Sequence, residues 1–79
     1  MMNYKEGDYY YILVRKNIKK YRLKANLTQQ ELAEKTGFTY QYIRDIESLA
    51  VIRRPRLDTL GIFAEALNIS IKDLFDEEE

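Results

Sequence analysis

Residues 28–47, T-Q-Q-E-L-A-E-K-T-G-F-T-Y-Q-Y-I-R-D-I-E, decide the fold of this 79-residue chain. Thr28 and Glu31 have the spacing of a capping box, in which each side chain satisfies a free backbone N–H at a helix start. Gly37 supplies the positive φ at which a helix ends, and Thr39 is an N-cap for a second helix. Two capped helices joined by a few residues predict a helix-turn-helix, whose second helix is suited to a DNA major groove.

The rest of the chain shows apolar spacing that predicts three more helices and no strand. The first covers residues 9–24, with Asp8 as its cap. The fourth covers residues 57–67, and Ser70 caps a last one. We therefore expect an all-α domain of five short helices. Its expected boundaries are a flexible N-terminal lead at 1–8, the helical domain at 9–75 and an acidic tail at 76–79.

The composition argues against an enzyme. The chain has no cysteine and no histidine, which excludes thiol chemistry, disulfides and the commonest general base and metal ligand. No glycine-rich phosphate loop or paired carboxylates are visible. We expect no catalysis, cofactor, metal or small-molecule ligand. The apolar run at residues 9–14 is too short for a signal peptide or a membrane span, so we expect a cytoplasmic protein that binds no membrane.

The formal net charge is zero, but the charges are unevenly distributed. Residues 15–56 hold eleven Lys or Arg against four Asp or Glu, a net charge of +7, and the remainder carries −7. This separation favours a DNA-facing surface backed by an acidic one. An acidic tail that merely keeps the protein in solution is the alternative.

In their order, these features resemble the Cro/repressor-type (XRE-family) helix-turn-helix DNA-binding proteins of bacteria and phages. The resemblance covers about residues 18–75 and is carried by Ile18, Tyr21, Arg22, residues 27–33, residues 37–39, Tyr42, Ile43, Ile46, Glu47, Pro55, Leu57, Leu60, Phe63, Ala64, Leu67, Ile69 and Leu74. It implies a five-helix, lambda-repressor-like domain whose third helix enters the major groove. It also implies a symmetric dimer on a palindromic double-stranded DNA operator.

The resemblance assigns roles to individual residues. Those expected to contact base edges are Thr39, Tyr40, Gln41, Arg44 and Asp45. Those expected to contact phosphates are Gln29, Tyr42, Ser48, Arg53, Arg54 and Arg56. Arg22 and Glu47 match a pair that forms an internal salt bridge. Chemically, Gln41 suits adenine and Arg44 suits guanine, each discriminating by about 1–3 kcal/mol. Tyr42 either contacts a phosphate or packs against the second helix. Asp45 either accepts a hydrogen bond from a base or holds Arg44 in place.

Two positions depart from the family pattern. Many relatives have a glycine two residues after Glu47, where this chain has Leu49. Either the third helix runs on by a turn or the following loop exposes apolar residues, which would suit a weak homodimer contact. The residues expected in that contact are Leu49, Val51, Ile52 and Leu57. Arg56 replaces the usual Ser or Thr cap of the fourth helix, at a cost of about 1 kcal/mol.

The leading function is therefore a sequence-specific double-stranded DNA-binding transcriptional regulator, specifically a repressor, from a bacterium or phage. The alternative is a protein-interaction module, antitoxin-like or an adaptor, that uses the apolar 49–57 loop.

Overall fold

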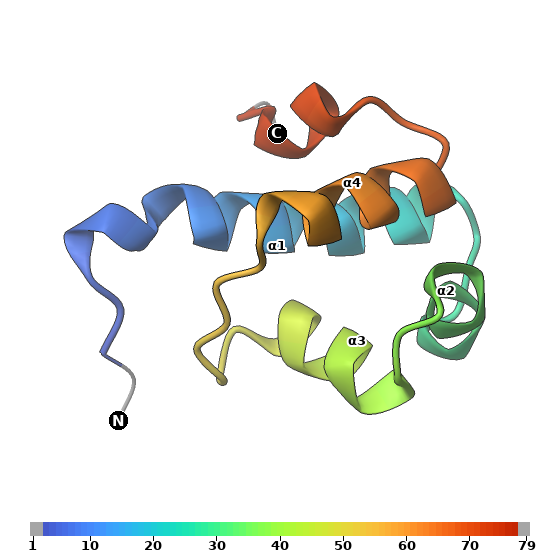
Figure 1. The fold of residues 1–79 in the computed structure, drawn as a ribbon, viewed down its shortest axis with the longest axis horizontal. Coiled ribbons are helices and arrows are strands. Elements are labelled where there is room, and N and C mark those ends of the chain that lie inside the picture. Colours follow the sequence, from blue (N-terminus) through green and yellow to red (C-terminus); the bar gives the residue numbers. More distant parts are fainter. Residues whose placement is uncertain (1–2, 78–79) are drawn as a thin grey trace.

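The computed structural model describes residues 3–77, which form four α-helices and two 3-10 turns (Figure 1). Their bounds are η1 Glu6–Asp8, α1 Tyr9–Lys24, α2 Gln29–Thr36, α3 Tyr40–Ser48, α4 Leu57–Ala66 and η2 Ile71–Phe75. The all-α prediction is confirmed, and no strand occurs in these residues. The expected fifth helix is a 3-10 turn. No helix within residues 3–77 has the length and apolar character needed to cross a membrane.

The capping interactions expected in the helix-turn-helix are present. Thr28 Oγ1 accepts from the backbone N–H of Glu31 at 3.0 Å, and a Glu31 carboxylate oxygen accepts from the N–H of Thr28 at 2.8 Å. Gly37 ends α2 at a φ of 81°. Thr39 Oγ1 accepts from the N–H of Tyr42 at 3.1 Å and starts α3. Because each of these bonds is local, the motif folds as its spacing predicts.

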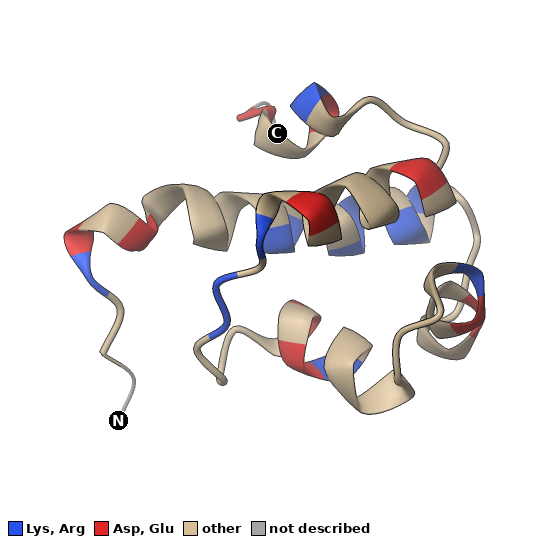
Figure 2. Ribbon diagram, viewed as in Figure 1, with Lys and Arg blue, Asp and Glu red and all other residues tan. Residues whose placement is uncertain are grey.

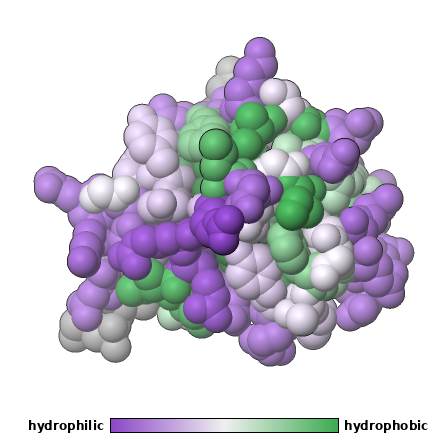
Figure 3. Space-filling model, viewed as in Figure 1, coloured by the Kyte–Doolittle hydropathy of each residue, from purple (hydrophilic) through white to green (hydrophobic). Residues whose placement is uncertain are grey.

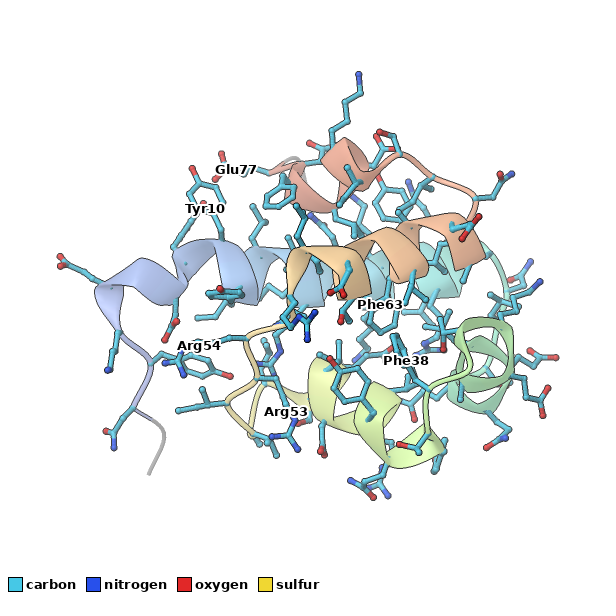
Figure 4. All side chains as sticks on the ribbon, viewed as in Figure 1. Tyr10, Phe38, Arg53, Arg54, Phe63 and Glu77 are labelled. Carbon is cyan, nitrogen blue, oxygen red and sulfur yellow. The ribbon has the colours of Figure 1, made fainter. Side chains whose placement is uncertain are left out.

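The core lies where α1 and α4 cover the helix-turn-helix (Figure 1). Its buried apolar residues are Val14, Ile18, Leu32, Ala33, Ile43, Ile46, Leu60, Phe63, Ala64, Leu67 and Leu74. Phe63 of α4 packs against Phe38 of the turn, with ring centroids 5.2 Å apart (Figure 4). This contact packs α4 against the turn of the helix-turn-helix, and among residues 3–77 Figure 1 shows no helix on the outer side of α3.

The start of the chain is more closely attached than the sequence suggested. Within its described part, Glu6–Asp8 forms a 3-10 turn, and the Tyr4 hydroxyl donates to the carbonyl of Leu49 at 2.9 Å. Asp8 forms no side-chain cap on α1, so that prediction is wrong. Its carboxylate instead accepts from the N–H of Lys5 and from the Arg54 guanidinium. Met1, Met2, Glu78 and Glu79 lie outside the described residues.

α3 ends at Ser48 and does not run on. Leu49 takes the left-handed conformation, at a φ of 58°, at the position where the resemblance predicted a glycine. For a leucine this conformation costs on the order of 1–3 kcal/mol and persists only when its surroundings hold it. The Tyr4 hydroxyl on the Leu49 carbonyl is one such contact. At α4, Arg56 makes no side-chain cap, as its replacement of Ser or Thr predicts.

Candidate nucleic-acid interface

α3 turns an apolar face inward and a polar face outward. Ile43 and Ile46 are completely buried, whereas Tyr40, Gln41 and Arg44 are exposed. The Arg44 guanidinium lies over the Tyr40 ring, 5.7 Å from its centroid. The exposed groups therefore form one surface of a helix that lies at the edge of the molecule (Figure 1).

Two of the expected base-contacting residues bond to each other. The Gln41 amide nitrogen donates to Asp45 Oδ1 at 2.9 Å. Arg53 Nη2 donates to Asp45 Oδ2 at 2.8 Å. The hydrogen bond from Gln41 and the nearby Arg53 hold the pKa of Asp45 below its usual value, against the effect of its partial burial. These hydrogen bonds join Gln41, Asp45 and Arg53, and so link the outer face of α3 to the basic loop, the segment between α3 and α4.

Arg54, expected to contact a phosphate, is held by a carboxylate. Its Nε and Nη2 donate to the two oxygens of Asp8 at 2.7 and 2.8 Å, and Figure 4 places Arg54 beside the N-terminal segment. These bonds, together with the Lys5 N–H, lower the pKa of Asp8 from 3.8 to about 2. Arg56 pairs with Asp58 at 3.0 Å, in a fully exposed geometry of little energetic value. A DNA phosphate must therefore compete with a carboxylate for Arg53, Arg54 and Arg56.

A buried salt bridge supports α3 from below. Arg22 donates to both carboxylate oxygens of Glu47, at 2.7 and 2.9 Å, and to the carbonyl of Leu27 at 2.7 Å. Gln29 Nε2 donates to the same carboxylate at 3.0 Å. Removing one partner of such a pair costs about 3–5 kcal/mol, because a charge stays buried without compensation. Gln29 is therefore tied to the salt bridge in the DNA-free protein, at the start of α2.

Arg15 holds the end of α3, a role that the sequence reading missed. Its side chain is completely buried. Nε donates to the carbonyl of Ile46 at 2.9 Å, and Nη2 donates to those of Asp45 and Val51 at 2.8 and 2.6 Å. Nη1 donates to the Tyr4 hydroxyl at 2.9 Å and to the carbonyl of Arg53 at 3.2 Å. A cation is favourable there because the last carbonyls of a helix carry its negative dipole end.

The helical spacing contained a signal for this residue. Arg15 stands four residues after Tyr11 and three before Ile18, so it belongs to the face of α1 that packs inward. A cation in that position needs buried acceptors. Arg22, seven residues after Arg15, lies on the same face of α1 and is buried as well.

The remaining site candidates differ in exposure. Tyr42 is half-buried, with its ring 5.1 Å from that of Phe38, and burial raises its pKa; this favours packing as its main role. Ser48 is exposed and its hydroxyl lies 3.4 Å from the carbonyl of Asp45. Thr39 is exposed, with its oxygen engaged in the α3 cap.

The charge count also needs correction. Of the charged residues between 15 and 56, Arg15, Arg22 and Glu47 are buried, which leaves nine basic and three acidic residues at the surface. Figure 2 shows basic residues along the segment that joins α3 to α4 and on the far half of α1. The basic surface is therefore smaller than the sequence suggested, and much of it near α3 is paired with acids.

An exposed polar helix, started by a cap and preceded by a second capped helix, defines a helix-turn-helix domain. Residues 18–74 match the helix-turn-helix family model, and the chain belongs to this family, in its XRE-type branch. It is 39% identical to the control protein C.SmaI of Serratia marcescens over 62 residues, which cover 78% of this chain and 71% of that protein. The master regulator for biofilm formation SinR, solved in complex with DNA, is similar in structure. Its TM-score is 0.71 at 30% identity, covering 80% of this chain and 98% of SinR.

Proposed function

We propose that this DNA-binding transcriptional regulator, of bacterial or phage origin, represses transcription in the bacterial cytoplasm by occupying a palindromic double-stranded operator as a homodimer. The observation that carries the proposal is the exposed face of α3, where Gln41 and Arg44 stand beside a loop with three arginines. The relatives support it, since one is a control protein and the other is a regulator solved with DNA.

In this proposal α3 enters the major groove. Arg44 pairs with guanine through two hydrogen bonds, and Gln41 reads the neighbouring base. The loop arginines, together with Gln29 and Ser48, contact phosphates and set the orientation of α3 without reading sequence. Occupancy of the operator then excludes other proteins from the same stretch of DNA.

Replacing Arg44 should relax sequence preference. Loss of a two-bond contact to guanine removes about 1–3 kcal/mol of discrimination, or roughly a 5- to 150-fold preference at one base pair. Selection of bound duplexes from a random pool, carried out with the wild type and with Arg44→Ala, measures this preference. Arg56→Ala is the matched control, because its side chain is exposed and lies outside α3; it should weaken all sequences about equally. The reverse pattern would show that α3 is oriented differently from this proposal.

The dimer contact that we propose centres on Leu57. This residue is 72% exposed and stands at the rim of an apolar groove whose other lining residues are Gly7, Tyr10, Tyr11, Val14, Pro55, Leu60 and Phe75. Apolar surface is visible over α4 and η2 in Figure 3. A protruding leucine and a groove on one face suit a two-fold contact, in which each copy inserts Leu57 into the other. Leu49, Val51 and Ile52, expected to share this contact, are half-buried, which also weakens the interaction-module alternative.

Leu57→Glu should convert the dimer to a monomer. Moving a carboxylate from water into an apolar groove costs more free energy than its contacts in the groove could return. Sedimentation equilibrium of the wild type and the variant measures the dissociation constant, which should rise at least tenfold. Leu23→Glu is the matched control, because Leu23 is 55% exposed on the other end of α1. Equal dissociation constants for Leu57→Glu and the wild type would reject this interface.

A further inference from the structure

The side chain of Gln41 has two different ends. An amide carries a donor nitrogen and an acceptor oxygen, and a half-turn about its last bond exchanges them. A free glutamine can therefore satisfy either a donor or an acceptor on a base. In this protein the nitrogen lies 2.9 Å from Asp45 Oδ1. An ionised carboxylate only accepts hydrogen bonds, so the reversed amide would place two acceptors against each other.

Asp45 is itself fixed in position. Its second oxygen accepts from Arg53 at 2.8 Å, and its side chain is only 14% exposed. Its backbone carbonyl accepts from the buried Arg15. The hydrogen bonds from Gln41 and from Arg53 and the positive charge of Arg53 lower the pKa of Asp45, which keeps the carboxylate ionised at neutral pH. In the DNA-free protein the partner of Gln41 is therefore an ionised acceptor in a defined position.

With its nitrogen bonded to Asp45, Gln41 keeps its oxygen as the end of the amide available to a base. In the major groove adenine and cytosine offer an amino donor, whereas guanine and thymine offer a carbonyl acceptor at the corresponding position. We propose that Asp45 is a specificity-determining residue that makes Gln41 select a base with an amino group, adenine or cytosine, and reject guanine and thymine. This inference rests on the proposed function, since it requires that α3 reads DNA. The second hydrogen on the Gln41 nitrogen remains compatible with two-bond pairing to adenine.

The test compares Asp45→Asn and Asp45→Ala with the wild type. Asparagine keeps the shape of Asp45 but offers a donor or an acceptor, so Gln41 becomes free to turn over; alanine removes the contact. Affinities are measured for four duplexes that differ at the base pair whose preference Gln41→Ala abolishes. The wild type should favour an amino base there by roughly tenfold to a hundredfold. Both variants should reduce this preference to about threefold or less, with circular dichroism confirming that they are folded.

The same substitution in a Gln41→Ala background separates two mechanisms. If Asp45 acts through Gln41, Asp45→Asn changes no base preference once Gln41 is absent. An equal change in that background would show that Asp45 reads the base itself, and would overturn the inference. An unchanged preference in Asp45→Asn and Asp45→Ala would also overturn it, while leaving the proposed function intact. Failure of the wild type to bind any duplex specifically would instead reject the proposed function, and this inference with it.

Discussion

Raising the salt concentration from about 50 to about 200 mM should weaken operator binding by roughly a thousandfold. Each phosphate neutralised by Lys or Arg releases counterions, and the affinity falls with salt accordingly. The proposed dimer would place Arg53, Arg54 and Arg56 of both copies against phosphates. About six such contacts predict a slope of about −5 for the logarithm of affinity against the logarithm of salt concentration. Fluorescence anisotropy with a labelled duplex measures this slope.

The size of the slope reports on the ion pairs of the free protein. Asp45, Asp8 and Asp58 hold the three arginines in the structure described here. If these carboxylates keep their partners on DNA, few counterions are released and the slope becomes shallow. Arg56→Ala is the control, because it should reduce the slope by about one for each copy. Absence of binding at about 50 mM salt would favour the interaction-module alternative.

Arg15→Met should destabilise the fold by about 3–5 kcal/mol, because it removes the hydrogen bonds that a completely buried guanidinium donates, and bonds to a charged group contribute about 1.5–3 kcal/mol each. The substitution removes the side-chain donor of the Ile46 carbonyl and the shorter bond at the carbonyls of Asp45 and Val51, which keep longer bonds from Ser48 and Tyr4. Each buried group left unsatisfied costs about 1–3 kcal/mol. A domain of this size has a total unfolding free energy of roughly 4–12 kcal/mol. Urea denaturation followed by circular dichroism measures the change.

Two variants make this result specific to the guanidinium. Lys16→Met alters the neighbouring residue, which is exposed, and should change stability by no more than about 0.5 kcal/mol. Arg15→Lys keeps the charge but concentrates its donors on one nitrogen, so it should lie between the wild type and Arg15→Met. Equal stability of Arg15→Met and Lys16→Met would mean that Arg15 does not hold the end of α3.

The helix-turn-helix was predictable because its determinants are short-range. Thr28 with Glu31, Gly37 and Thr39 act on backbone groups within four residues. The predicted range of α1, residues 9–24, is also the observed one. The last segment was predicted as a helix but remains a 3-10 turn of five residues, even though Ser70 caps it as expected.

Asp8 shows why other predictions failed. Its position just before α1 suggested a cap, which would have supplied one bond to a neutral N–H. Arg54, 46 residues away, instead gives it two charge-assisted bonds, which are roughly twice as strong as neutral ones. Spacing along the chain contains no information about such a partner.

The sequence by itself determined the family, the position of the helix-turn-helix and the residues of α3 available to DNA, because periodicity and capping depend on near neighbours. Tertiary structure decided which distant partners support those residues. The bond from Gln41 to Asp45 spans one turn of α3, but Arg15 reaches Ile46, and Arg53 reaches Asp45, only after α1, α3 and the following loop have packed together. Charged side chains that the composition alone would assign to the surface are buried, and they support α3 from inside the protein.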